Sequence, residues 1–387
     1  MSYLRRASTR SLIIVIVVVV CALAAGGAAI AMAAGGGGPA PPPKPLDQAI
    51  NDALSASSPA GVTADVQFTN NLFPSGALLG QAGSALMTGA SGRLWLTNDG
   101  HGRIELQSDA GDVQIVWDPQ TISVYDASSN TVYRADLPQQ TSSSGTDTNA
   151  PPTLAEIDSF LTKLGVDWAL SGAQPTNVGG QPAYSVSVSP KHDGGLLGSL
   201  QLAWDASQGT PLRVGVYAQG DSTPVLELAV TNISYGAVAP GDVNVAPPAG
   251  AKVVDLGGRT PDTGSGTPAV TGLAAVQAAA PFPVVAPDTL VGLPRKDVRL
   301  VGGGTVIVLY GQGLGGIALI ERKADSSSTG SNGVLSNLPS VSLDGLTAHE
   351  LATQLGTLLE WQSGGTSYVL AGSLPASAAE TAARAVK

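Results

Sequence analysis

The stretch that decides the fold is RLWLTNDGHGRIEL, residues 93–106. On both sides of the turn-forming triplet Asn98-Asp99-Gly100, aliphatic residues alternate with polar residues or with Trp95. A period of two places every second side chain on one face of a strand. The stretch therefore predicts two antiparallel strands joined by a turn. Their shared apolar face comprises Leu94, Leu96, Ile104 and Leu106.

The same alternation recurs through most of residues 46–256, with two helical patterns beside it. One helix is predicted over 46–54, and a second follows the capping box formed by Thr153 and Glu156. A sheet of about ten or eleven strands must curl to bury its apolar face. The predicted fold class is β-rich α+β: an open, curved antiparallel half-barrel with helices in its mouth. The further strands are expected at 62–68, 113–117, 122–124, near 132, and at 184–188, 200–204, 212–216 and 226–230.

The N-terminus predicts a transmembrane helix. Arg5, Arg6 and Arg10 precede an uncharged apolar run over 12–34. As a helix this run would be about 34 Å long, enough for a hydrocarbon core of about 30 Å. The arginines orient the N-terminus toward the cytoplasm, so that residues 35–387 are exported.

Two other interpretations of residues 1–34 stay open beside the retained anchor. A signal peptide could be cleaved near Ala31-Met32-Ala33, where small residues flank the bond. Lipid attachment at Cys21 is a third interpretation, although Val20 stands where a lipoprotein signal needs Gly or Ala.

Composition divides the remaining chain into units. Residues 35–45 form a Gly/Pro stalk, and residues 46–256 form the half-barrel. A linker rich in Gly, Pro, Ala and Thr covers 257–281. Residues 282–387 are predicted as a smaller C-terminal α+β domain. Within the half-barrel, the polar stretch 139–152 is predicted as a long surface loop.

The C-terminal domain shows both the period of two that is typical of strands and the three- to four-residue spacing that is typical of helices. Strands are predicted at 305–310 and 316–321, joined by a glycine-rich turn, and at 366–370. The pair Thr347 and Glu350 predicts a capping box at the start of a helix that carries Leu351, Leu355 and Leu358. A second box, Ser377 and Glu380, predicts a final helix ending near Val386.

The charge balance excludes a nucleic-acid partner. The chain has 19 basic and 29 acidic residues, a net charge of −10. Without residues 1–34, which hold three Arg and no acid, the exported part has 16 basic residues against 29 acidic ones, or −13. Phosphate backbones require an excess of Lys and Arg.

The sequence predicts no cofactor, no metal and no enzymatic activity. One Cys and three His leave little for metal sites, and His101 in a turn, His192 in a loop and His349 in a helix are not spaced as ligands. Asp112 and Asp126 lie at strand ends, where Asp favours turns. The glycines at 302–304 and 311–313 are interpreted as turns, because neither run belongs to a strand, glycine loop and helix with a Lys.

Because the sequence predicts no catalytic or metal site, apolar surface is the remaining candidate for a functional site. The segment Leu72–Met87 is unusually apolar for a loop. Either it folds onto a packed core, or it forms the rim of an acyl-chain-sized cavity inside the curved sheet. In the second case the ligand cavity would be lined by Leu94, Leu96, Ile104, Leu106, Ile115, Trp117, Leu202 and Trp204.

The order of elements over residues 46–255 resembles the LolA-like superfamily of periplasmic lipoprotein carriers. That resemblance implies the half-barrel fold and a hydrophobic ligand. The residues that carry it are Leu94-Trp95-Leu96, Arg103-Ile104-Glu105-Leu106, Gly111-Asp112-Val113, Val124-Tyr125-Asp126, Asn130-Thr131-Val132-Tyr133, the 200–216 hairpin, Asn232-Ile233-Ser234-Tyr235-Gly236 and the segment 247–253.

The later part resembles the C-terminal domain of the MucB/RseB type. The similar segments are 306–310, 317–321, 367–372 and 379–386. Members of that type are implied to guard an anti-sigma factor against proteolysis and to respond to mislocalised lipid or lipoprotein. The expected function is therefore a membrane-tethered, exocytoplasmic binder of lipid or of acylated lipoprotein that regulates a membrane partner such as an anti-sigma factor. The alternative is a lipid or lipoprotein carrier in envelope transport.

Overall fold

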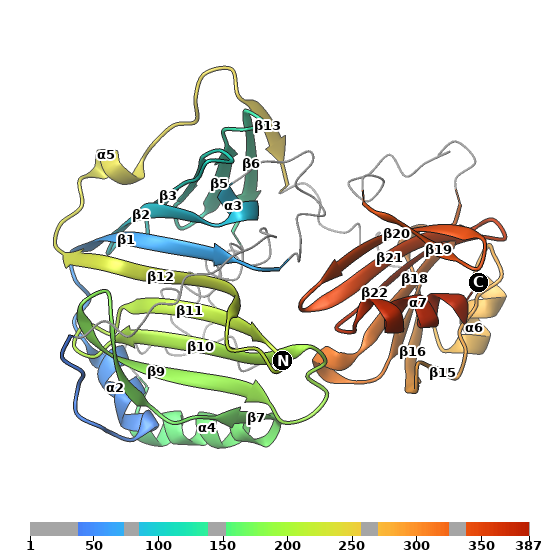
Figure 1. Ribbon diagram of the computed structural model, residues 1–387, viewed down its shortest axis with the longest axis horizontal. Coiled ribbons are helices and arrows are strands. Elements are labelled where there is room, and N and C mark those ends of the chain that lie inside the picture. Colours follow the sequence, from blue (N-terminus) through green and yellow to red (C-terminus); the bar gives the residue numbers. More distant parts are fainter. Residues whose placement is uncertain (1–37, 73–84, 138–151, 257–269, 325–337, 387) are drawn as a thin grey trace.

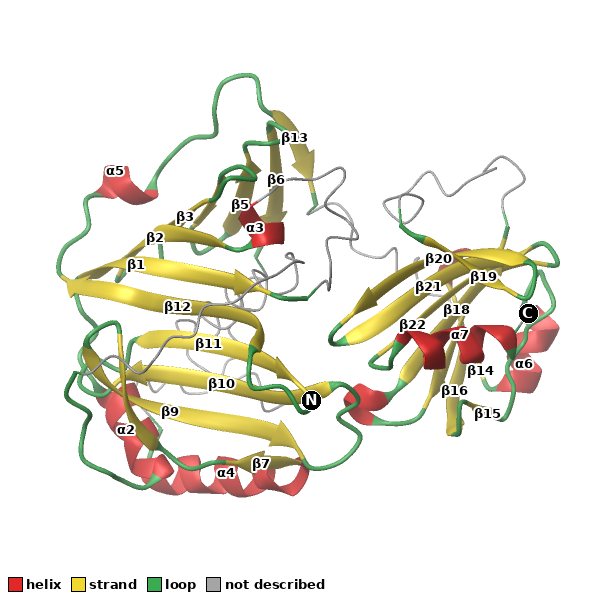
Figure 2. Ribbon diagram, viewed as in Figure 1, coloured by secondary structure: helices red, strands yellow, loops and turns green. Residues whose placement is uncertain are grey.

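The computed structural model describes residues 38–72, 85–137, 152–256, 270–324 and 338–386. Within these residues the chain forms two antiparallel-rich sheets with few helices (Figures 1 and 2). The first sheet has thirteen strands and the second has nine. The strands of the first run between residues 61 and 255, and those of the second run between 270 and 372.

The first sheet is a long, curved meander. Its strand order is β13-β6-β5-β4-β3-β2-β1-β12-β11-β10-β9-β7, and β8 also pairs with β9. Only β13 joins in parallel, to β6. The strands are β1 (Gly61–Asn70), β2 (Ala90–Thr97), β3 (Gly102–Gln107), β4 (Val113–Trp117), β5 (Thr121–Asp126), β6 (Thr131–Asp136), β7 (Trp168–Leu170), β8 (Gln174–Val178), β9 (Gln181–Pro190), β10 (Leu197–Asp205), β11 (Pro211–Ala218), β12 (Pro224–Tyr235) and β13 (Lys252–Asp255).

Every strand predicted in this sheet from the period of two is present. The predicted hairpin is β2 and β3, with Leu94 directly opposite Ile104. The count exceeds the expected ten or eleven because β7, β8 and β13 are also present. These three strands have three to five residues each, which is too short for alternation to stand out.

In the described part of the chain four helices accompany the first sheet: α2 (Leu46–Ser55), α3 (Ala85–Thr88), α4 (Leu154–Asp167) and α5 (Pro240–Val243). The predicted capping box at α4 is confirmed, because Thr153 Oγ1 accepts a hydrogen bond from Glu156 N and the Glu156 carboxylate accepts one from Thr153 N. The segment 38–45, within the predicted stalk, lies against the sheet. Pro41 is buried there, and Tyr184 Oη donates a hydrogen bond to Pro42 O at 2.7 Å.

The second sheet has the order β14-β16-β17-β18-β22-β21-β20-β19, with β15 paired to β16. Helices α6 (Leu273–Ala279) and α7 (Ala376–Arg384) accompany it, with the short 3-10 helices η3 (Gly302–Gly304) and η4 (Gly313–Gly315). The strands are β14 (Val270–Thr271), β15 (Thr289–Leu290), β16 (Leu293–Val301), β17 (Thr305–Tyr310), β18 (Ile317–Lys323), β19 (Ser340–Leu343), β20 (Leu346–Thr353), β21 (Gly356–Ser363) and β22 (Thr366–Gly372).

The helix predicted from Thr347 and Glu350 is wrong. These residues, with Leu351, belong to β20, and Leu358 belongs to β21, so His349 lies in a strand. A tight turn separates the two strands, in which Thr353 Oγ1 accepts hydrogen bonds from the backbone N–H groups of residues 355 and 356. The predicted final helix exists as α7, but its N-cap is Pro375 without a side-chain hydrogen bond, so the second predicted capping box is also wrong.

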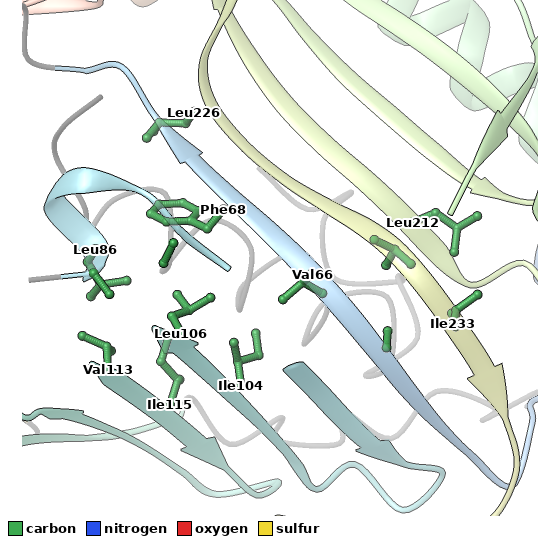
Figure 3. Close-up of a cluster of buried hydrophobic side chains, with 14 of the residues drawn as sticks. Val66, Phe68, Leu86, Ile104, Leu106, Val113, Ile115, Leu212, Leu226 and Ile233 are labelled. Carbon is green, nitrogen blue, oxygen red and sulfur yellow. The ribbon is translucent and has the colours of Figure 1, made fainter. Parts of the chain in front are cut away.

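Each sheet buries its own apolar cluster. The first core joins α3 to residues of β1 to β5 and β8 to β12, and Figure 3 shows Leu86 of α3 gathered with Phe68, Leu106 and Val113. The second core joins β16 to β22 with α6 and α7. A third, smaller cluster packs α2 on β9 and β10 through Ala49, Tyr184, Val186 and Trp204.

None of the described helices is both long and apolar enough to cross a bilayer. The predicted spanning run, 12–34, falls within residues 1–37 and lies outside the described residues.

Candidate functional site

Six of the eight predicted cavity residues come together in the first core. Ile104, Leu106, Ile115 and Trp117 are at most 4% exposed, and Leu94 and Leu96 pack against the same cluster. Direct pairing of Leu94 with Ile104, and of Ile104 with Ile115, places them on one face of the sheet. Their side chains fill a packed core.

The other two predicted residues lie elsewhere. Trp204 belongs to the small cluster beneath α2, where its ring lies 6.3 Å from that of Tyr184. Leu202 belongs to neither cluster and is 38% exposed. The structure therefore separates Leu202 and Trp204 from the first six residues.

The predicted rim is described only in part. Leu72 and Leu86 are packed in or against the first core. The predicted rim residues Phe73, Leu78 and Leu79 lie outside the described residues. The contact of Leu86 fits the interpretation in which this segment folds onto the core.

Around Leu202 the sheet carries a half-exposed apolar surface, which we call the aliphatic strip. Register defines it, because Leu202 pairs with Val214, and Leu200 pairs with both Val188 and Val216. Leu200 is 39% exposed, and none of the five is fully buried. The aliphatic strip consists of Val188, Leu200, Leu202, Val214 and Val216 on β9, β10 and β11.

Two packed clusters border the strip. On one side Val188 packs against the α2 cluster, and on the other Val216 packs against the first core. The strands that carry the strip are internal to the sheet, because β10 pairs with β9 and β11. Leu200 and Leu202 are thus exposed beside other aliphatic residues and between two packed clusters, and such a contiguous apolar surface can receive an apolar ligand.

A hydrogen-bond network around Asp205, at the end of β10, stabilises the fold. Tyr235 Oη donates a 2.7 Å hydrogen bond to Asp205 Oδ2, and Ser207 and Gln208 donate to Asp205 Oδ1. Burial alone would raise the pKa of Asp205, but these hydrogen bonds outweigh it and hold that pKa below its usual value. These hydrogen bonds tie the β10–β11 turn to β12. None of them involves a residue of the aliphatic strip.

The catalytic candidates of the sequence stay apart. His101 lies 3.2 Å from Asp99 in a turn, His192 is exposed in a loop, and His349 Nδ1 lies 3.3 Å from Leu338 O. The Asp126 carboxylate is engaged by Ser128 and Ser129. Among the described residues there is no group of three His, Cys, Asp or Glu side chains that could hold a metal ion.

A groove that sequence reasoning did not predict lies over β4 to β6, beneath residues 244–247. Its volume is about 290 Å³. Its polar side chains include Gln114, Ser123, Tyr125 and Arg134, and buried Trp117 and Val132 also line it. The groove depends on where a distant segment crosses the sheet, so no local sequence signal could have found it.

Comparison with family models finds no match, and comparison with curated proteins finds none either. Solved structures do match. A MucA/MucB complex of Pseudomonas aeruginosa is 16% identical, with 87% of this chain and 96% of that chain covered and a TM-score of 0.41. MucB in complex with MucA(peri) is 15% identical, with 88% and 96% covered and a TM-score of 0.39.

A LolA superfamily protein from Nitrosomonas europaea is 8% identical, with 85% of this chain and 91% of that chain covered and a TM-score of 0.18. All three TM-scores lie below 0.5, so none of these likenesses assigns a role to a residue of this chain. The matches include both kinds of structure that the sequence resembles, MucB and a LolA superfamily protein.

Proposed function

We propose that the chain is an exported, membrane-tethered, non-enzymatic protein that binds an acyl chain on the aliphatic strip. One observation carries this proposal. Leu200 and Leu202 stand about two-fifths exposed on an internal strand, between two clusters whose members are buried.

The chemistry of the strip favours an acyl chain over a polar ligand. Its five side chains are all Val or Leu and offer no hydrogen-bond donor or acceptor. A polar group placed there would lose its hydrogen bonds to water without replacement, at a cost of about 1–3 kcal/mol. A methylene chain loses nothing comparable and gains about 0.8 kcal/mol for each buried CH₂.

The biological setting of this proposal follows from the sequence. The apolar run 12–34, with arginines only before it, supports a single-pass tether with an exported remainder. A tethered protein cannot diffuse between membranes, which favours a lipid-responsive regulator of a membrane partner, such as an anti-sigma factor, over a carrier. The ligand would be a free lipid or the acyl chains of a lipoprotein.

Photolabelling tests the site. The full chain in phosphatidylcholine nanodiscs is incubated with palmitic acid bearing a diazirine in its chain, irradiated and digested, and the labelled peptides are identified by mass spectrometry. We expect adducts on β10 and β11 that unlabelled palmitate suppresses. Leu202→Ser removes the contact of about two methylene groups, or ~1.6 kcal/mol, and should raise the palmitate concentration needed for half-labelling about tenfold.

The matched control is Leu309→Ser, because Leu309 is 39% exposed on β17 of the second sheet. That variant should label β10 like the unchanged protein. Labelling spread evenly over both sheets, or equal losses in both variants, would overturn the proposal.

A further inference from the structure

The second sheet touches the first at the end of the strands that carry the strip. In Figure 1 the strands β9, β10 and β11 end beside the second sheet. Gln354 N, in the β20–β21 turn, donates a 3.0 Å hydrogen bond to Leu72 O. The next residue, Leu355, packs its side chain against the first core. A leucine of the second sheet therefore completes the apolar packing of the first.

One hydroxyl group links this contact to a second one. Ser373 Oγ donates a 2.8 Å hydrogen bond to Leu355 O and accepts a 2.9 Å hydrogen bond from Leu196 N. Leu196 lies in the loop between β9 and β10. The backbone of Gly315 reinforces that side, because its N–H donates to Asp193 O in the same loop.

The two contacts flank one end of the strip. Register aligns Val188, Leu200, Val216, Leu226 and Asn70 in one row across β9, β10, β11, β12 and β1. The β9–β10 loop follows Val188 and Leu72 follows Asn70. Because β1 and β9 run in the same direction, both lie beyond the same edge of this row, near its two ends. The 353–356 turn contacts Leu72 and Ser373 contacts Leu196, so both stand at this end of the strip.

We propose that Leu355 and Ser373 form a latch that closes this end of the strip, and that an acyl chain opens it. This inference rests on the proposed function. A chain that runs along the strip toward Leu200 reaches the 353–356 turn, and it displaces Leu355 from its packing against the first core. Because the ligand binds the open arrangement better, it shifts the population toward that arrangement and loosens the second sheet from the first.

Backbone amides report the latch directly. The N–H groups of Leu196 and Gln354 donate two of the hydrogen bonds that join the sheets, so both should be protected from hydrogen exchange without ligand. We expect palmitate, added to the full chain in phosphatidylcholine nanodiscs, to speed exchange at both amides at least fivefold. Amides within β18 and β22 should not change.

Two variants test the cause. Leu355→Ser should raise the affinity for diazirine palmitate about tenfold, because the closed state no longer competes. Leu309→Ser is the control and should bind like the unchanged protein. Ser373→Ala should free the Leu196 amide even without ligand, and Ser373→Thr, which keeps the hydroxyl group, should restore its protection.

The outcomes separate this inference from the proposed function. Labelling of β10 with unchanged exchange at Leu196 and Gln354, and with unchanged affinity in Leu355→Ser, overturns the latch and leaves the acyl site standing. Absence of competed labelling on β10 overturns both. Labelling of β10 together with faster exchange at both amides supports both.

Discussion

A carboxyl group sits inside the second core. Glu321 is fully buried; its Oε2 accepts a 3.1 Å hydrogen bond from Val285 N, and its Oε1 has no hydrogen-bond partner in the described part of the chain. Burial raises the pKa of Glu321 from 4.5 to about 7, although the bond from Val285 acts in the opposite direction. The folded protein therefore favours the neutral acid at this position.

This raised pKa makes the second sheet less stable as pH rises. Below about pH 4.5 the acid is neutral in both folded and unfolded chains and costs nothing. Between about 4.5 and 7 only the unfolded chain ionises, so stability is lost, and above 7 the loss levels off at about 3 kcal/mol. Glu321→Gln should remove this dependence, and amide exchange in β18 and β22 at pH 5 and pH 8 measures it.

The control for this prediction is Glu227→Gln in the first sheet, where the carboxylate lies 3.8 Å from Arg213. It should leave the pH profile of β18 and β22 unchanged. A Glu321→Gln variant that still loses stability between pH 5 and pH 8 to the same extent would contradict the assignment.

At the scale of the element, the β10–β11 turn is built against α2. Gly209 has φ +67°, and a Cβ atom there would overlap the backbone carbonyl of Ala53. Gly220 has φ +84° and nothing within 4 Å of such an atom. The two glycines thus share the left-handed backbone and differ in whether a helix lies against them.

Alanine substitutions exploit this difference. Gly220→Ala should cost only backbone strain, about 1–2 kcal/mol. Gly209→Ala should cost about 1–3 kcal/mol more, because α2 must shift. Amide exchange of α2 checks this, since it should accelerate in Gly209→Ala alone. Equal exchange in both variants would show that the turn does not hold the helix.

The strands and helices also show where the periodicity of apolar residues is enough to predict secondary structure. In β1 to β6 and β9 to β12 one face is apolar and the other polar, so the period of two predicts every strand. In 346–363 leucines at 351, 355 and 358 match a helical spacing. In the structure Leu351 pairs with Leu358 across β20 and β21, Leu358 also pairs with Ala371 of β22, and Leu355 lies in the turn. A local pattern cannot predict these pairings.

The same limit applies to the site. The sequence predicts that Ile104, Ile115 and Leu202 all lie on the apolar face of the sheet. In the structure Ile104 and Ile115 are buried in a packed core, whereas Leu202 is exposed. Which part of the face is covered depends on where α2 and α3 come to lie, and both contacts are distant in sequence. The period therefore predicts the apolar face, and only the fold shows where that face is open.

At the scale of the whole molecule, the two large cores have no member in common. Leu355 is the second-sheet residue that packs against the first core. Small interfaces couple units weakly, so unfolding should proceed in two transitions. Pulsed hydrogen exchange along a urea gradient measures separate midpoints for peptides of each sheet. At pH 8, Glu321→Gln should raise the midpoint of the second sheet alone.

A common shift of both midpoints in Glu321→Gln would show that the two sheets unfold as one unit. The same measurement at pH 4 supplies the control, because Glu321 is then neutral in both states and the variant should match the unchanged protein.

The segment that precedes α2 has a mechanical consequence. Residues 38–45 are fixed to the first sheet by the hydrogen bonds from Tyr184 Oη to Pro42 O and from Asn177 Nδ2 to Pro39 O, and by the buried ring of Pro41. Tension applied to the chain before residue 38 is thus delivered to β8 and β9. The pull enters through the sheet that carries the strip.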